Sequence, residues 1–139
     1  MSQISEIMTP NPICLSEHAN VHKARMLMAE KSIRHIPIIE PESKKLIGML
    51  NQKAVLSNAI KIINQRGLDN LEHEEKAIEV ASIMQRDASS IEIGQSLLEV
   101  ANTLLEQKSG CVVICEQSKV VGVISSKDFV KLAARELAR

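Results

Sequence analysis

The chain contains two copies of one sequence pattern. Residues 7–40, IMTPNPICLSEHANVHKARMLMAEKSIRHIPIIE, align without a gap with residues 83–116, IMQRDASSIEIGQSLLEVANTLLEQKSGCVVICE, at a constant offset of 76 positions. After two extra loop residues in the first copy, LIGMLNQKAVL (46–56) aligns with VVGVISSKDFV (120–130). Few residues are identical, but the apolar positions and the turns agree. A solenoid needs at least three repeats, so we expect two half-domains that share a core.

Each copy predicts the same order of elements. A short apolar run, ICL or SIEI, predicts a first strand, and a capping residue, Asn20 or Ser96, then precedes apolar residues at helical spacing. Two apolar runs follow, HIPII with KLIGML and CVVIC with KVVGVIS, and each pair predicts a hairpin whose two faces are both covered. Helices over 52–65 and 126–137 close the copies. We therefore expect an α+β fold of two pseudo-symmetric β-α-β-β-α repeats, packed sheet to sheet as one module.

The boundaries follow from the repeat. We assign residues 1–65 to the first repeat, 66–75 to a linker and 76–139 to the second repeat. Gly67 is expected to end a helix. The acidic stretch LDNLEHEEKAIE (68–79) is interpreted as a solvated face, and HEEKAIEVASIM is expected to begin a further helix.

Composition excludes several classes of protein. The chain has 139 residues with 17 basic and 17 acidic side chains, so its zero net charge argues against a nucleic-acid or acidic-membrane partner. Phe129 is the one aromatic residue, too few for binding single strands by base stacking. No apolar run reaches the ~20 residues that cross a bilayer, and the start lacks a signal-peptide pattern, so a cytoplasmic protein is expected. The three cysteines, an odd number in apolar surroundings, are expected to be reduced and buried.

Four segments together resemble a known family. They are EIMTPNP before the first strand, IRHIPIIE at the second strand, and the strand-to-helix turns GMLNQKA and GVISSKD. Their order, repeated at a fixed offset, resembles the CBS-domain pair, or Bateman module, over about residues 5–135. The resemblance implies a non-catalytic sensor without an obligatory cofactor, which binds an adenosine-containing ligand (AMP, ADP, ATP or S-adenosylmethionine) between its repeats. It also implies a homodimer formed through helices, and a separate effector protein.

The second copy carries the family's ribose-binding turn, Gly-x-x-Ser/Thr-x-x-Asp. Ser125 and Asp128 match it, and an ionised carboxylate can accept both hydrogen bonds of a cis-diol. The alternative is purely structural: Ser125 caps a helix and Asp128 interacts with the helix dipole. The first copy has Asn51 and Ala54 at these positions, and alanine cannot accept a ribose hydrogen bond. We therefore expect one competent site per chain.

By the same resemblance, the ligand of Asp128 also contacts the opening segment and the second strand of the first copy. Arg34 and His35 are the candidates for binding phosphate, because a guanidinium fork matches phosphate oxygens. Their counterparts in the second copy, Gly110 and Cys111, carry no charge, so the basic pair and the ribose turn belong to the same predicted cleft. The alternatives are a solvated arginine and a hydrogen-bonded, partly buried histidine. The complete predicted ligand-binding set is Met8, Thr9, Ile13, Arg34, His35, Ile36, Pro37, Ile124, Ser125 and Asp128.

Other chemistry has little support in the sequence. His18 and His22 are four apart, a spacing that suits a metal on a helix, but Asn20 is expected to begin the helix between them, so no metal site is expected. No cysteine has a histidine and acid partnership that would support nucleophilic catalysis. Two functions remain: an adenosine-ligand sensor, or a ligand-free dimerising scaffold that acts on a separate partner. The sequence does not choose the ligand, the partner or the dimer geometry.

Overall fold

The computed structural model describes residues 3–139, and its contacts divide the chain into two units. The first is built from the opening residues through Pro12 together with Ala88–Arg139, and the second from Ile13–Asp87. The elements of the first unit are α1 (Ile4–Ile7), β1 (Thr9–Pro10), β5 (Ser90–Glu92), α5 (Leu97–Glu106), β6 (Cys111–Glu116), β7 (Lys119–Ser125) and α6 (Ser126–Leu137). Those of the second are β2 (Leu15–Ser16), α2 (Val21–Lys31), β3 (His35–Ile39), β4 (Leu46–Asn51), α3 (Gln52–Arg66), the 3-10 turn η1 (Leu68–Asn70), α4 (Leu71–Lys76) and the 3-10 turn η2 (Val80–Ser82).

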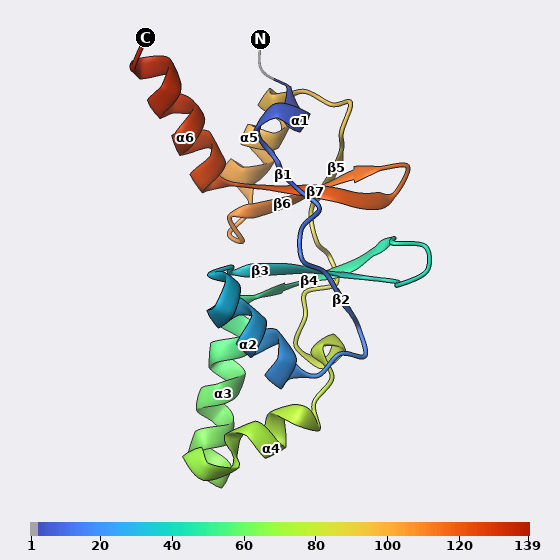
Figure 1. The fold of residues 1–139 in the computed structure, drawn as a ribbon, viewed down its shortest axis with the longest axis vertical. Coiled ribbons are helices and arrows are strands. Elements are labelled where there is room, and N and C mark those ends of the chain that lie inside the picture. The colour runs from blue at the N-terminus through green and yellow to red at the C-terminus, as the bar shows by residue number, and fades with distance from the viewer. Residues whose placement is uncertain (1–2) are drawn as a thin grey trace. The chain divides into compact units, whose positions relative to one another are not determined.

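The Ile13–Asp87 unit is a three-stranded sheet covered by helices. Its strand order is β2-β3-β4, with β2 parallel to β3 and β3 antiparallel to β4. Helices α2 and α3 lie on one face of this sheet, and α4 contacts both of them on the side away from the strands (Figure 1). The core residues of this unit are Leu15, Val21, Ala24, Met28, Ile36, Ile38, Leu50, Val55 and Val80.

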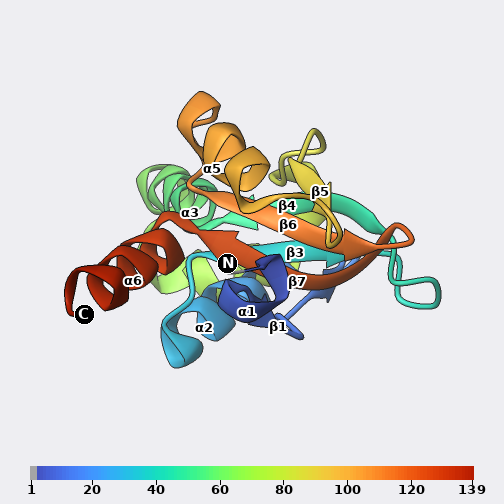
Figure 2. The same cartoon turned by 90° about the horizontal axis from the view of Figure 1, so that it is seen from above.

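The other unit has a four-stranded sheet in the order β1-β7-β6-β5. Strands β6 and β7 form the predicted antiparallel hairpin, and β5 runs parallel to β6. The core residues are Ile4, Val100, Val112, Ile114 and Ile124. Helix α6 begins directly at the end of β7, projects away from the sheet in both ribbon views (Figures 1 and 2), and contains no buried residue.

The α+β fold class and the β-α-β-β-α order of each copy are confirmed. The helix starts have the physical cause that the sequence indicates. The Asn20 side chain accepts a hydrogen bond from the Lys23 amide at 2.8 Å, and Ser96 accepts one from the Glu99 amide at 3.2 Å. Each bond satisfies an amide that has no partner within the first helical turn.

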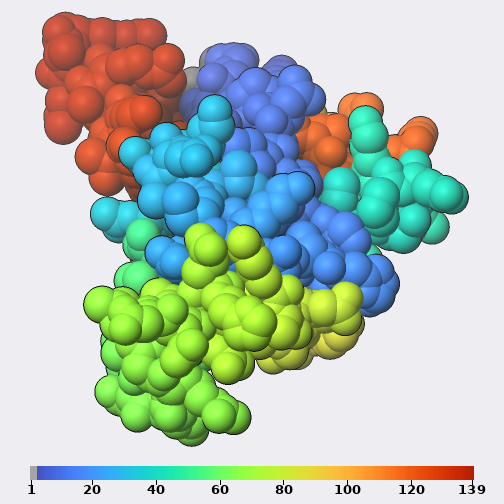
Figure 3. All heavy atoms as spheres, turned by 60° about the horizontal axis from the view of Figure 1, so that its bottom comes forward, coloured from blue at the N-terminus to red at the C-terminus, as the bar shows by residue number. Residues whose placement is uncertain are grey.

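The linker differs from its sequence interpretation. Residues Leu71–Lys76 form α4. The prediction that HEEKAIEVASIM begins a further helix is wrong, because α4 ends at Lys76 and is followed by the short turn η2. The expectation of a solvated acidic face is wrong at Glu75, whose exposed fraction is 0%. Its partners are Arg25 and His22 on α2, about fifty positions earlier in the chain. Figure 3 shows the α4 surface, in yellow-green, adjoining the blue surface of α2.

The opening segment of each copy lies on the sheet of the other copy. Thr9 of β1 pairs with Val123 of β7, and Gln85 forms an antiparallel bridge with Met49 of β4. The two units of the structure therefore differ from the two sequence repeats, because each unit contains the opening segment of the other repeat. The boundaries at residues 65 and 75 describe the sequence repeats and stay a prediction. Among the described residues, no helix is both long and apolar enough to cross a membrane.

A glycine lies under each exchanged segment. A Cβ atom on Gly122 would collide with the Met8 sulfur and lie 3.1 Å from the Thr9 carbonyl oxygen. A Cβ atom on Gly48 would lie 2.7 Å from the Gln85 carbonyl oxygen. The segments can cross these strands closely because neither position has a side chain.

Gly48→Ala is therefore expected to destabilise the protein by about 1–3 kcal/mol, the usual cost of forcing extra volume into a packed site. The Gln85 backbone must move to admit the methyl group. The free energy of unfolding, measured by urea titration with circular dichroism, gives the value. Gly94→Ala is the control, since nothing lies within 4 Å of its Cβ position. Equal urea midpoints for the two variants would contradict the packing argument.

Candidate functional site

The predicted ribose turn joins β7 to α6. The Ser125 amide donates a hydrogen bond to Asp128 Oδ2 at 2.8 Å, and the Ser125 hydroxyl lies 3.3 Å from the same oxygen. Together with the return bond from the first helical turn, these contacts form a capping box. The structural interpretation of these two residues is thus correct. Both contacts use Oδ2, however, so Oδ1 lies outside the capping box and can accept a further donor.

The predicted opening segment lies beside this turn. Helix α1 ends at Ile7 with Met8 as its C-cap, and Thr9 then pairs with Val123 on the strand that leads into the turn. The Asn11 amide continues this contact by donating to the Val121 carbonyl at 3.1 Å. Met8 is half-buried and Thr9 is exposed. The structure therefore brings Met8, Thr9, Ser125 and Asp128 together in one unit, although they come from opposite ends of the chain.

The predicted residues on strands β7 and β3 differ in how far their side chains are exposed. Ile124 and Ile36 are 0% exposed, each within the core of its own unit. Because side chains alternate along a strand, His35 and Pro37 point to the face of β3 opposite Ile36. His35 is half-buried and Pro37 is buried.

Arg34 and Ile13 flank strands of the Ile13–Asp87 unit. Arg34 is exposed just before β3, and its carbonyl oxygen accepts a hydrogen bond from the Gln52 amide at 2.8 Å. Ile13 is half-buried just before β2. The contribution of both residues to ligand binding stays a prediction.

The corresponding turn of the first copy is engaged in helix capping alone. The Asn51 side-chain oxygen accepts a hydrogen bond from the Ala54 amide at 2.8 Å, which begins α3. Ala54, at the position of Asp128, has no side-chain acceptor. This turn therefore offers no carboxylate oxygen to a ribose.

The cysteine side chains are poor nucleophiles. Burial, and then the negative charge of Asp128, raise the pKa of Cys111 to about 12, and burial with Glu92 raises the pKa of Cys115 to about 11. Both thiols stay protonated near neutral pH, and the thiolate is the reactive form. Burial also raises the pKa of Cys14, which is only half-buried. The expectation of buried thiols thus holds for Cys111 and Cys115 and in part for Cys14.

Each histidine of the His18 and His22 pair contacts carboxylates. His18 Nδ1 lies 2.7 Å from Glu79 Oε2, and His22 lies against Glu75 and Glu72. Within residues 3–139 no group of three or more metal-ligating side chains is assembled. The sequence interpretation missed the contact between Glu75 and α2, because nothing local marks which linker carboxylate becomes buried.

A hollow of the Ile13–Asp87 unit lies away from both strand-to-helix turns. Its volume is about 570 Å³, and it lies between β2 and the start of α2, where it is lined by residues such as Cys14, His18 and Lys23. None of its lining residues belongs to either strand-to-helix turn. The Ser125–Asp128 turn remains the candidate site, because its chemistry and geometry, rather than a hollow, define it.

Comparison with known proteins identifies the family. The pattern that defines the CBS domain matches residues 4–67 and again residues 80–135, which together make up most of the chain. The chain therefore belongs to the CBS-domain family, with two CBS domains in sequence.

Relatives of the whole sequence are distant. Protein MJ1225 of Methanocaldococcus jannaschii is 26% identical over 135 residues, which cover 97% of this chain and 44% of that protein. The homoserine O-acetyltransferase of Methanococcus vannielii is 25% identical over 127 residues, which cover 91% of this chain and 24% of the enzyme. The chain thus spans less than half the length of these relatives.

Solved structures share the fold over nearly the whole chain. A Vibrio cholerae protein described as an acetoin utilization protein has a TM-score of 0.78 at 27% identity and covers 99% of this chain and 94% of its own. CBSX2 in complex with AMP has a TM-score of 0.78 at 21% identity, with full coverage of both chains. The CBS-domain pair of protein MJ0100, in complex with 5-methylthioadenosine and S-adenosylmethionine, has a TM-score of 0.78 at 19% identity and covers 98% of each chain.

Proposed function

We propose that this chain is a non-catalytic regulatory module that binds one adenosine-containing ligand at the Ser125–Asp128 turn. The observation that carries the proposal is that the capping contacts of Asp128 use only one of its two carboxylate oxygens. Its Oδ2 atom closes the capping box, and Oδ1 is left as an acceptor for a ribose hydroxyl. The capping box also fixes the rotamer of Asp128 before a ligand arrives, which lowers the entropy cost of binding.

The rest of the ligand would be recognised by those predicted residues that are not fully buried. Backbone groups between Thr9 and Ile13 would contact the adenine edge, and aliphatic side chains with the Met8 thioether would cover its faces. Arg34 and His35 would contact phosphate or another anionic group. No cofactor is obligatory in this proposal, and none of these residues is assigned a catalytic step.

The ligands in two solved structures support the adenosine class. CBSX2 was crystallised with AMP, and the MJ0100 domain pair with 5-methylthioadenosine and S-adenosylmethionine. These ligands share the adenosine part and differ beyond the ribose. A carboxylate that contacts the ribose would therefore serve all of them, and the choice among AMP, ADP, ATP and S-adenosylmethionine falls to the groups at the other end.

We also propose that the module is a cytoplasmic homodimer that acts on a separate effector protein. Two helices expose apolar side chains that a second copy could cover. Leu56 and Ile60, one turn apart on α3, are 49% and 60% exposed, and Val130 and Leu137 on α6 are 67% and 86% exposed. The same surfaces favour the second candidate function, a scaffold that dimerises without a ligand.

Thermal unfolding in the presence of ligands separates the two candidates. AMP, ADP, ATP and S-adenosylmethionine would each be added at millimolar concentration, with GMP as the matched control, and unfolding would be followed by circular dichroism. At 100 times its dissociation constant, a ligand stabilises the folded state by about 2.7 kcal/mol, which raises the Tm by several degrees. We expect at least one adenosine compound to produce this shift and GMP to produce a smaller one. If no adenosine compound shifts the Tm, the scaffold function is favoured instead.

A further inference from the structure

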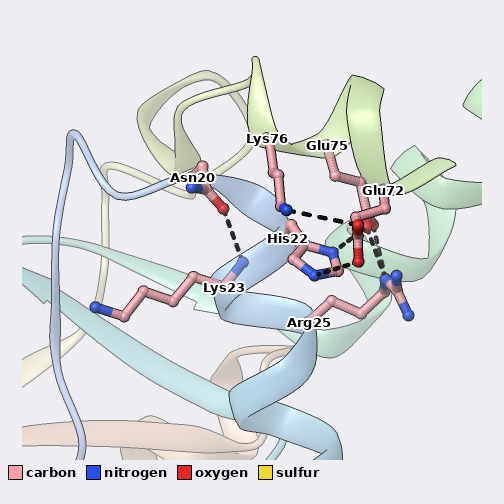
Figure 4. A network of polar contacts seen from close by, with 7 residues as sticks. All are labelled: Asn20, His22, Lys23, Arg25, Glu72, Glu75 and Lys76. Carbon is pink, nitrogen blue, oxygen red and sulfur yellow. Dashed lines mark hydrogen bonds and ion pairs between the residues drawn. The ribbon is translucent and has the colours of Figure 1, made fainter. Parts of the chain in front are cut away.

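A fully buried carboxylate fastens the linker helix α4 to α2. Glu75 is 0% exposed, and both of its oxygens accept from Arg25 Nε, at 2.9 and 2.8 Å. His22 Nδ1 lies 3.2 Å from the same carboxylate. Figure 4 shows these side chains converging between the two helices. We refer to His22, Arg25, Glu72 and Glu75 as the carboxylate cluster.

Both ring nitrogens of His22 face carboxylate oxygens. Nδ1 lies 3.2 Å from Glu75 Oε1, and Nε2 lies 3.2 Å from Glu72 Oε1 (Figure 4). The His22 side chain is 15% exposed, so water has limited access to it. Ionised carboxylates only accept hydrogen bonds, and a neutral imidazole has a single N–H donor. Only the doubly protonated ring can donate to both partners at once.

The other charged side chains that contact His22 or its two carboxylate partners are arginine and lysine. The hydrogen bond with Glu75 raises the pKa of Arg25, so this guanidinium stays charged. Lys76 lies 3.5 Å from Glu72, and Arg66 on α3 lies 3.9 Å from Glu74 on α4. Helix α4 also carries the exposed imidazole of His73. Imidazole side chains ordinarily change charge between pH 5 and 8, whereas lysine, arginine and glutamate side chains do not.

We propose that His22 is a proton-dependent latch that holds the linker helix α4 against α2. When His22 is protonated, it bridges Glu72 and Glu75 and so ties two positions of α4, three residues apart, to one side chain of α2. When it loses a proton, one ring nitrogen presents a lone pair to a carboxylate, and that contact becomes repulsive. Arg25 continues to hold Glu75, so α4 loosens at the Glu72 end while Glu75 stays in place.

The latch would act on the segment that leads into the second CBS domain. Directly after α4, the Ile78 carbonyl accepts a hydrogen bond from the Val21 amide at 2.9 Å, and the Val80 amide donates to the Ala19 carbonyl at 2.8 Å. The chain then reaches Gln85, whose backbone pairs with Met49 on β4. Protonation of His22 would therefore stabilise the path of this segment over its own sheet. This inference is independent of the proposed adenosine ligand.

Amide hydrogen exchange tests the latch in the 139-residue chain without added ligand. The protection of Leu71–Lys76, corrected for intrinsic exchange, would be compared between pH 5.5 and pH 8.5. We expect it to fall roughly tenfold as the pH rises, the equivalent of one hydrogen bond to a charged group. His22→Gln should abolish this pH dependence. His18→Gln is the matched control, because His18 also contacts two carboxylates, Glu79 and Glu17, but its side chain is 73% exposed.

Two results would overturn the latch: a pH dependence that persists in His22→Gln, or one that disappears in His18→Gln. If His22→Gln does not fold, the wild type alone decides. Nitrogen-15 NMR of the His22 ring should then show protons on both nitrogens at pH 5.5 and loss of one of them at higher pH, together with the loss of α4 protection. A ring that keeps one proton throughout this range would exclude the proposal.

Discussion

Arg25→Ala is expected to destabilise the protein by about 3–5 kcal/mol, the usual cost of removing one partner from a buried ion pair. Glu75 is 0% exposed and Arg25 provides its two shortest hydrogen bonds, so the substitution leaves a buried carboxylate with His22 as its remaining close contact. Urea unfolding followed by circular dichroism measures the change. Most single substitutions cost less than this, so the effect would stand out.

Two further variants show whether the loss comes from the unpaired charge. Arg25→Met combined with Glu75→Leu removes both charges and should recover most of the stability, because an apolar pair can replace a buried ion pair at little cost. Lys76→Ala removes an exposed partner of Glu72, whose side chain is 63% exposed, and should cost about 0–1 kcal/mol. An Arg25→Ala variant no less stable than Lys76→Ala would show that the cluster does not hold α4.

Asp128→Asn is expected to weaken binding of the adenosine ligand about 10- to 100-fold, while the protein remains folded. A hydrogen bond to a charged group contributes about 1.5–3 kcal/mol, and each 1.4 kcal/mol corresponds to a factor of ten in the dissociation constant. The asparagine oxygen can still accept the Ser125 amide, so the start of α6 should survive. Calorimetric titration of both proteins gives the two dissociation constants.

The first copy provides the matched control for this substitution. Asn51→Ala removes a helix cap at the corresponding turn and should lower stability by about 1 kcal/mol, with little effect on ligand affinity. If Asp128→Asn and Asn51→Ala change the affinity equally, Asp128 acts only through the helix cap. The ribose contact would then have to be abandoned.

Elements whose pattern is local were predicted well. The run HIPII coincides with β3, and KVVGVIS coincides with β7, because continuous apolar residues bounded by turn residues identify a buried strand. The run ICL was less informative: β2 contains only Leu15 and Ser16, because this edge strand pairs with β3 at just two positions. Single-sequence patterns do not report how many residues of an edge strand find a partner.

Long-range contacts account for what the sequence did not reveal. The polar linker pattern around Glu75 is typical of a solvated helix, and its burial depends on Arg25 and His22, which are distant in the chain. The exchange of opening segments likewise depends on pairing between distant positions, Thr9 with Val123 and Gln85 with Met49. In both cases the local sequence carries no signal, because the structure depends on partners that are distant in the chain.

The sequence of the candidate turn agrees with two interpretations. The spacing of Ser125 and Asp128 fits a capping box and a ribose-binding turn equally well, and the structure contains the capping box. The sequence alone could not show that one carboxylate oxygen completes the cap while the other is left over. This division of the two oxygens makes the structural and the binding interpretations compatible.

Calorimetric titration of the wild-type protein with AMP, ADP, ATP and S-adenosylmethionine tests ligand binding at the Ser125–Asp128 turn, because it reports affinity and stoichiometry together. We expect at least one of these ligands to bind with one site per chain, since the first copy's turn has Ala54 in place of a side-chain acceptor. Absence of binding by all four ligands at millimolar concentration would contradict the proposed function. Two equivalent sites per chain would contradict the assignment of the site to Asp128.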